Sequence, residues 1–191
     1  FEAGHSSVGP VGDADAQEVS RSTQAPEGAH LMATMAGALV KAIAEAIKAA
    51  LPGDWVVKYG TSDWSGVGRD MSEPSIFVRY MQDSEQVAGN LMANVRPLIS
   101  VYVTRPHDAD PSTLASHEST LDLMADVRQA VHDLCIAHSQ GAATIAGFDG
   151  PIFYESATST PAVASLGGGA GGVESVTIDF QFRYIRPAGG R

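Results

Sequence analysis

The closest approach to a metal-binding pattern in this sequence is His132-x-x-Cys135-x-x-His138. On one α-helix Cys135 lies three residues from each histidine, but the histidines lie six residues apart, which is roughly 240° around the helix axis. The three side chains therefore cannot converge on one ion from a regular helix. No second pair of ligands accompanies them, so the pattern predicts no metal site, and Cys135 is interpreted as a core residue.

A second group of chemically capable side chains is His107-Asp108-Ala109-Asp110, which places three potential ligands in one loop. Loops often carry function, but Asp and Pro before a helix are also ordinary turn and cap chemistry. Trp55 and Trp64 flank a glycine-containing loop, where a small molecule could bind. These two features leave open an alternative, a small-ligand-binding or metal-dependent enzyme domain.

The glycine run at residues 167–172 does not have the form of a phosphate-binding loop. It lacks the Lys-Ser/Thr pair of a P-loop, and the pattern that follows it is typical of a strand rather than a helix. The sequence also contains no Gly-x-Ser-x-Gly elbow. We therefore predict no catalytic residues, no cofactor and no enzymatic activity.

Composition narrows the classes of protein that fit. The 191 residues are enough for one domain with a tail, and 12 basic against 22 acidic residues give a net charge of −10. Such acidity argues against a groove that binds duplex nucleic acid. One cysteine excludes an internal disulfide framework. No apolar run is long enough to span a membrane, and no secretory leader is visible, so the expectation is an intracellular protein.

Two amphipathic helices are predicted. The first covers residues 30–51 and ends at Pro52-Gly53. The second begins near residue 112, where Ser112 or Thr113 can cap it, and runs to residue 138. The expected apolar stripe of the first helix is Leu31, Met35, Leu39, Ile43, Ile47 and Leu51. That of the second is Leu114, Leu121, Met124, Val127, Val131, Leu134 and Cys135.

Five strands are predicted from alternating apolar residues, with the clearest at residues 173–186. Its aromatic face should meet the core and its polar face should meet water or a polar partner. The segments 82–90 and 160–172 are expected to be loops. The other strands are expected at residues 55–59, 75–81, 98–104 and 151–156, and the start of the third can extend back toward Leu91.

These elements predict an α+β fold in the order α-β-β-β-α-β-β. A mostly antiparallel sheet of about five strands should carry both helices on one face. Residues 1–29 contain no Leu, Ile, Met, Trp or Tyr and are interpreted as an extended or flexible arm, and residues 188–191 as a flexible end. Residues 30–187 form the single domain.

The order of elements, together with the segments SIFVRYM, RPLISVYVTRP, LDLMADVRQAVHDLC and VESVTIDFQFRYIRP, resembles the tail terminator, or tail completion, proteins of tailed bacteriophages. The resemblance covers residues 30–187 and lies in organisation rather than in a diagnostic motif. Phe180, Phe182 and Tyr184 stand where that family has an aromatic final strand. The arm and the glycine-rich segment depart from a minimal member.

The resemblance implies a virion structural protein, assembled in the host cytoplasm, that forms a ring, commonly a hexamer. The ring caps the head-proximal end of the tail tube and joins it to the neck. Implied partners are further copies of the chain, the tail tube protein, a connector or head-completion protein and possibly a sheath protein. DNA would pass through the lumen without specific binding. Another neck, head-completion or tail-tube subunit of the same fold is the alternative. The candidate interface residues are Trp64, Arg69, His107, Asp108, Asp110, Leu166, Gly168 and Arg183.

Overall fold

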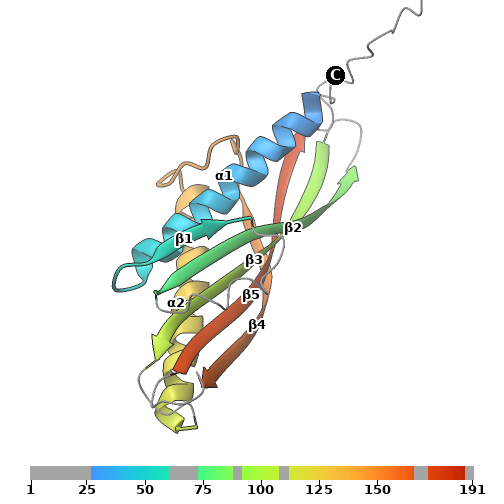
Figure 1. Ribbon diagram of the computed structural model, residues 1–191. Coiled ribbons are helices and arrows are strands. Elements are labelled where there is room, and N and C mark those ends of the chain that lie inside the picture. Colours follow the sequence, from blue (N-terminus) through green and yellow to red (C-terminus); the bar gives the residue numbers. More distant parts are fainter. Residues whose placement is uncertain (1–26, 61–72, 88–91, 108–111, 166–171, 188–191) are drawn as a thin grey trace, which may run out of the picture.

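The computed structural model describes residues 27–60, 73–87, 92–107, 112–165 and 172–187. Two helices and five strands follow one another in the predicted order (Figure 1). The first helix begins at Glu27, three residues before the expected start. The elements are α1 (Glu27–Ala50), β1 (Val56–Tyr59), β2 (Ser75–Val87), β3 (Met92–His107), α2 (Leu114–Ser139), β4 (Phe153–Ser165) and β5 (Gly172–Pro187).

The strands form one sheet in the order β1-β2-β3-β5-β4. β1 runs parallel to β2, and every other neighbouring pair is antiparallel, which confirms the mostly antiparallel sheet. β5, the last strand in the chain, pairs between β3 and β4. This interior position fits its sequence, because its side chains that face the helices are all apolar from Val176 to Tyr184.

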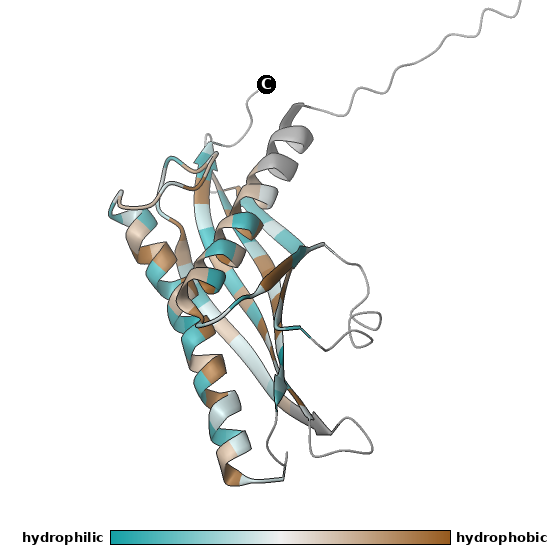
Figure 2. Cartoon of the chain, turned by 60° about the vertical axis from the view of Figure 1, so that its left-hand side comes forward, coloured by the Kyte–Doolittle hydropathy of each residue, from teal (hydrophilic) through white to brown (hydrophobic). Residues whose placement is uncertain are grey.

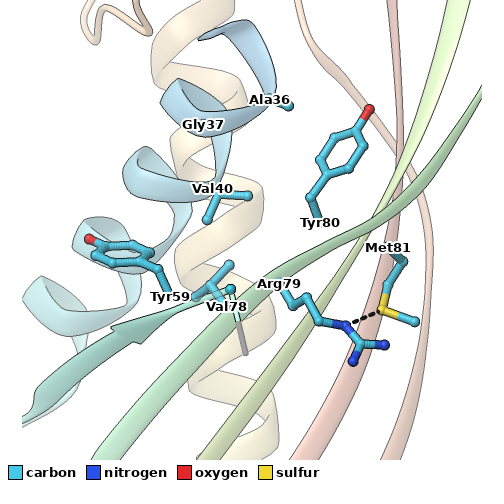
Figure 3. A pocket seen from close by; sticks show the side chains of 9 residues that line it. Ala36, Gly37, Val40, Tyr59, Val78, Arg79, Tyr80 and Met81 are labelled. Carbon is cyan, nitrogen blue, oxygen red and sulfur yellow. Dashed lines mark hydrogen bonds between the residues drawn. The ribbon is translucent and has the colours of Figure 1, made fainter. Parts of the chain in front are cut away.

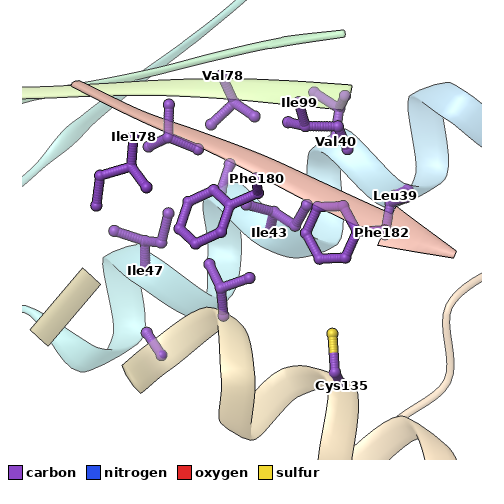
Figure 4. Packing of buried hydrophobic residues seen from close by; sticks show 14 of the residues in the cluster. Leu39, Val40, Ile43, Ile47, Val78, Ile99, Cys135, Ile178, Phe180 and Phe182 are labelled. Carbon is purple, nitrogen blue, oxygen red and sulfur yellow. The ribbon is translucent and has the colours of Figure 1, made fainter. Parts of the chain in front are cut away.

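Both helices lie on the same side of the sheet (Figure 2), and the core fills the space between them and the strands. Phe180 and Phe182 of β5 are fully buried there, with ring centroids 6.0 Å apart. They point from β5 toward the helices, with Ile43 and Ile47 of α1 beside them and Cys135 of α2 below (Figure 4). The predicted aromatic core face of the last strand is therefore confirmed.

Local sequence explains where α2 begins and which face it buries. Thr113 has an extended backbone and its side-chain oxygen accepts a hydrogen bond from the Ser116 amide, so it is the N-cap that the sequence offered. The predicted stripe was wrong in part, because Leu114 is 71% exposed and Leu123 is buried instead. Ser116 and Thr120 occupy the buried face at this end of the helix.

Three strands are longer than predicted. β2 continues through residues 82–87, where we expected a loop, and β3 begins at Met92, within the extension toward Leu91 that the sequence allows. β4 continues to Ser165, so residues 160–165 belong to a strand and not to the glycine-rich loop. Residues 82–86 of β2 are polar on both faces, and the ladder to β3 stabilises them where apolar alternation does not, whereas the first residues of β3 place Ala93 and Val95 in the core.

Candidate self-association surface

One edge of the sheet is only partly covered. β1 has four residues and pairs with β2 as far as Val78, after which the Gly60 amide donates to the Val78 carbonyl at 3.1 Å. Residues 80–87 of β2 continue beyond that point. Among the described residues they have a strand neighbour only on the β3 side. Their other side is an open edge that a further strand can extend.

A groove opens beside this edge, between α1 and β2 (Figure 3). It has a volume of about 600 Å³, and Ala36, Gly37 and Val40 of α1 line one wall. A Cβ atom added to Gly37 would meet nothing within 4 Å. The small residues therefore leave room above the helix for another chain. The opposite wall consists of Tyr59, Gly60, Val78, Arg79, Tyr80 and Met81. We call this space the α1–β2 groove.

The phenols in the α1–β2 groove are neutral at physiological pH. Burial, followed by the charge of Asp83 and a hydrogen bond to it, raises the pKa of Tyr80 well above its usual range. Burial and the nearby Glu45 also raise the pKa of Tyr59. Arg79 is half-buried, and its Nε donates to the Met81 sulfur at 2.8 Å. The groove thus presents aromatic, aliphatic and sulfur surface with a single cation at its rim.

The other edge of the sheet is β4, which among the described residues pairs with β5 alone. A second groove of about 310 Å³ lies beside its first residues, between β4 and the C-terminal half of α2. Ile136 is 41% exposed there and Phe153 is 39% exposed. We call this space the α2–β4 groove, and its lining consists of His132, Cys135, Ile136, Ser139, Gln140, Ile152, Phe153 and Tyr154.

Exposed apolar side chains gather at these two edges. The described residues include nine large apolar side chains that are exposed, and six of them lie along the edges: Val56, Tyr59, Met81, Val87, Ile136 and Phe153. Apolar surface that collects beside open strands is typical of a protein–protein contact. The two edges lie on opposite sides of one sheet, so a contact between them would join different copies of the chain.

Arg183, a predicted interface residue, lies beside the β4 edge and pairs with Phe153. Its Nε is 3.0 Å from Glu155, and its guanidinium lies 4.6 Å from the centre of the Phe153 ring. Arg96 of β3 reaches the same carboxylate at 3.6 Å. Glu155 sits at the irregular step of β4 between Tyr154 and Ser156. Arg183 therefore positions the start of β4, on the face of the sheet that the helices leave uncovered.

His107 closes the far end of β3 against α2. Its Nε2 is 2.7 Å from the Ser116 hydroxyl, which is itself 2.9 Å from the Thr113 cap. These contacts fix the first turn of α2. The structure places His107 and Arg183 in different regions of the sheet and does not bring them together. The other interface candidates, Trp64, Arg69, Asp108, Asp110, Leu166 and Gly168, lie outside the described residues, as does the expected arm up to residue 26.

The histidines around Cys135 point in different directions. His132 is exposed and meets the Tyr154 ring edge-on at 5.9 Å. His138 lies with Nδ1 and Nε2 each 3.1 Å from a backbone carbonyl, those of Ala143 and Gly150. It thereby ties down the loop between α2 and β4. Among the described residues, no three side chains are placed to hold a metal ion. Trp55 is 3% exposed and belongs to the core.

Cys135 should be chemically inert in the folded protein. Burial raises the pKa of its thiol from 9.0 to about 11. At pH 8 the thiolate fraction is then about a hundredfold lower than that of an ordinary cysteine with this reference pKa. We expect a thiol reagent such as DTNB to react at least a hundredfold more slowly with the native protein than with the urea-unfolded protein.

The raised pKa of the Cys135 thiol also determines how the stability of the fold depends on pH. The unfolded thiol ionises near pH 9 and the folded thiol near pH 11. The unfolded state therefore loses a proton first, and stability should fall as the pH rises through this window. A Cys135→Ala variant should lose that part of the pH dependence. A native protein that reacts as fast as the unfolded one would contradict the burial of this thiol.

Glu174 is the buried residue that the sequence analysis missed. It is 1% exposed, and its carboxylate contacts Arg105 of β3 and the hydroxyls of Ser119 and Thr120 of α2. A signal was present in the sequence, because Glu174 precedes Val176 by two residues and so shares the core face of β5. This cluster joins three elements at the end of the sheet opposite the open part of β2.

Comparison with known proteins does not identify a relative. No protein-family model matches the sequence, and no curated protein matches it. Within the part of the chain that the structure describes, neither helix is long and apolar enough to cross a membrane. The proposal below therefore rests on the residues and geometry of this chain and on the resemblance in element order.

Proposed function

We propose that this chain is the subunit of a ring, a tail terminator that caps the head-proximal end of a phage tail tube and joins it to the neck. The observation that carries the proposal is the sheet with an open edge on each side. β2 is open over residues 80–87 and β4 along its length, among the described residues. Two different edges on opposite sides of one subunit favour head-to-tail association. Such association closes into a ring when the rotation between copies permits it.

The remaining features support a structural role. The polar clusters of the described residues fasten elements to one another: Glu174 joins β5 to β3 and α2, and His138 holds the loop before β4. The two grooves are lined mainly by apolar side chains beside strand edges. Such surfaces fit extended protein segments better than a small reactive substrate. The tail tube and the neck remain the proposed partners at the two ends of the ring.

The proposal is tested by adding the purified chain to its tail tube protein during tube assembly. A terminator should arrest growth, so electron microscopy should show shorter tubes with a ring at one end. Native mass spectrometry of the chain alone should show a closed ring of about six copies. Open polymers of the chain would favour the alternative, a tube-type subunit of the same fold. Tubes of unchanged length that carry no ring would reject the terminator.

A further inference from the structure

We infer that residues 153–161 of β4 in one copy add as an antiparallel strand to residues 80–87 of β2 in the next copy, with Pro161 in the α1–β2 groove and Val87 in the α2–β4 groove. This inference rests on the proposed self-association and names its contact. The occupant of the α1–β2 groove is therefore a second copy of this chain.

Strand directions support this pairing. β2, β3, β5 and β4 alternate in direction, since each neighbouring pair among them is antiparallel. If the next copy continues the sheet, its β2 lies beside β4 and runs in the opposite direction. The alternation thus passes across the interface unbroken, and antiparallel pairing gives well-directed main-chain hydrogen bonds.

On both edges, backbone N–H and C=O groups are directed outward, away from the strands already paired. Pro161 pairs in register with Val176 although it has no N–H to donate, so the missing donor belongs to the outer side of β4. By the two-residue alternation of a strand, Ser159 and Ala157 direct their N–H groups outward too. On β2 the Val78 carbonyl accepts a hydrogen bond from the Gly60 amide on the β1 side. By the same alternation the groups of Tyr80 should face that side, just before the irregular step of β2 between Tyr80 and Gln82.

The two strands have matching side-chain faces. Pro161, Ser159 and Ala157 lie opposite Val176, Ile178 and Phe180, whose side chains face the helices. Tyr80 packs against the same core from β2. Pairing these residues places the Pro161 ring beside Tyr80 and above Gly37, where a Cβ atom would have no neighbour within 4 Å. The pairing must stop at Tyr80, since β1 already occupies the edge of β2 from Ser75 to Val78.

At the other end of the pairing, Val87 reaches the first residues of β4. Val87 is 66% exposed, the largest exposed fraction among the apolar residues at the two edges. The α2–β4 groove lies beside those residues and is lined by Ile136 and Tyr154. At one end of the pairing, Pro161 of the first copy enters the α1–β2 groove of the second copy. At the other end, Val87 of the second copy enters the α2–β4 groove of the first copy.

Charge favours pairing of unlike edges over pairing of like edges. A two-fold pairing of β2 with another β2 would bring Asp83 and Glu85 close to their own copies, and like charges on opposing strands are destabilising. The β4 strand carries a single charged residue, Glu155, which is already held by Arg183 and Arg96. Against β4, the acidic residues of β2 meet serine, threonine and alanine.

The test uses two variants that each block one side of the contact. Gly37→Trp fills the α1–β2 groove from a helix position with open space, and replacing a mid-helix glycine favours the helix. Ser159→Pro removes an outward N–H from β4 at a position equivalent to Pro161. The matched controls are Ala49→Trp, which is exposed on α1 outside the groove, and Ser159→Ala, which keeps the N–H.

The mass of each sample is measured by native mass spectrometry and sedimentation velocity, with far-UV circular dichroism as the check of folding. We expect both controls to assemble as the wild type does and each blocked variant to associate at least a hundredfold more weakly. An equimolar mixture of Gly37→Trp and Ser159→Pro should form one-to-one dimers, because each copy keeps one intact side. If either blocked variant assembles normally, or if the mixture remains monomeric, the inferred contact is wrong.

The outcomes separate the contact from the function. Wild-type rings together with a monomeric mixture would keep the ring and reject this contact. Heterodimers from the mixture together with open wild-type chains would keep the contact and reject the closed cap. Monomers in every sample would reject both.

Discussion

Replacing Phe180 with alanine should lower the free energy of unfolding by about 3–5 kcal/mol, the range that truncation of a buried phenylalanine gives. Phe180 is fully buried on the interior strand β5 and stacks with Phe182 at 6.0 Å. Tyr154 of β4 meets it edge-on at 6.0 Å, so removal of the ring leaves a cavity bounded by two other aromatic side chains. Since such a domain has only about 5–15 kcal/mol of stability, this one change should bring it near the threshold of folding.

Urea denaturation followed by circular dichroism measures this loss. The wild type and the variant are compared at one protein concentration, because self-association raises apparent stability. In a domain of this size each kcal/mol corresponds to roughly 2–4 °C in the melting temperature. Leu114→Ala is the matched control, since Leu114 is 71% exposed and lines neither groove, so its truncation should change stability by less than about 1 kcal/mol. Equal losses for the two variants would contradict the position of Phe180 in the core.

The elements that the sequence predicted well are those in which burial and periodicity agree. The alternation from Val176 to Tyr184 predicted β5 and its core face, and the four-residue spacing from Met35 to Leu51 predicted the buried side of α1. Thr113 was a cap candidate because a hydroxyl before an apolar stripe satisfies a free amide of the first turn. In each case one local pattern reports directly on one face of one element.

The open edges were not predictable in the same way. Residues 82–87 read Gln-Asp-Ser-Glu-Gln-Val, which shows no apolar alternation, yet they form a strand because β3 supplies a complete ladder. Edge strands need polar residues to avoid uncontrolled pairing, so their sequences resemble loops. Residues 160–165 of β4 read Thr-Pro-Ala-Val-Ala-Ser, and the glycine run that follows them predicts a loop, yet they form a strand because β5 supplies their ladder.

The candidate site depends on lengths and distances that no single segment encodes. The α1–β2 groove exists because β1 ends at Tyr59 while β2 continues to Val87. Gly37 lines it from a helix nineteen residues before β1 begins. Most of the predicted interface residues fall in expected loops, with Arg183 on the last strand, whereas the structure places the best-formed apolar surface on strand edges and on the helices beside them.

Arg105→Met should destabilise the fold by about 3 kcal/mol, as expected when a buried ion pair loses one partner. Glu174 is 1% exposed, so its carboxylate would remain buried without the neighbouring guanidinium. Ser119 and Thr120 cannot replace that charge. Thr120 has one hydroxyl proton, and its Oγ1 lies 3.0 Å from the Ser116 carbonyl and 3.2 Å from Glu174. Donation to one of these acceptors excludes donation to the other.

The two members of the pair should not respond equally to substitution. The Arg105 side chain is 28% exposed, so after Glu174→Leu the guanidinium can turn toward solvent, whereas the carboxylate has no such route after Arg105→Met. We therefore expect Glu174→Leu to destabilise less than Arg105→Met. The double variant should be more stable than Arg105→Met alone, because an apolar pair of similar volume removes the buried charge altogether. Urea denaturation of the four proteins in a double-mutant cycle measures this coupling. Additive losses would show that Arg105 and Glu174 act independently, and the cluster would then not be what fastens β5 to β3 and α2.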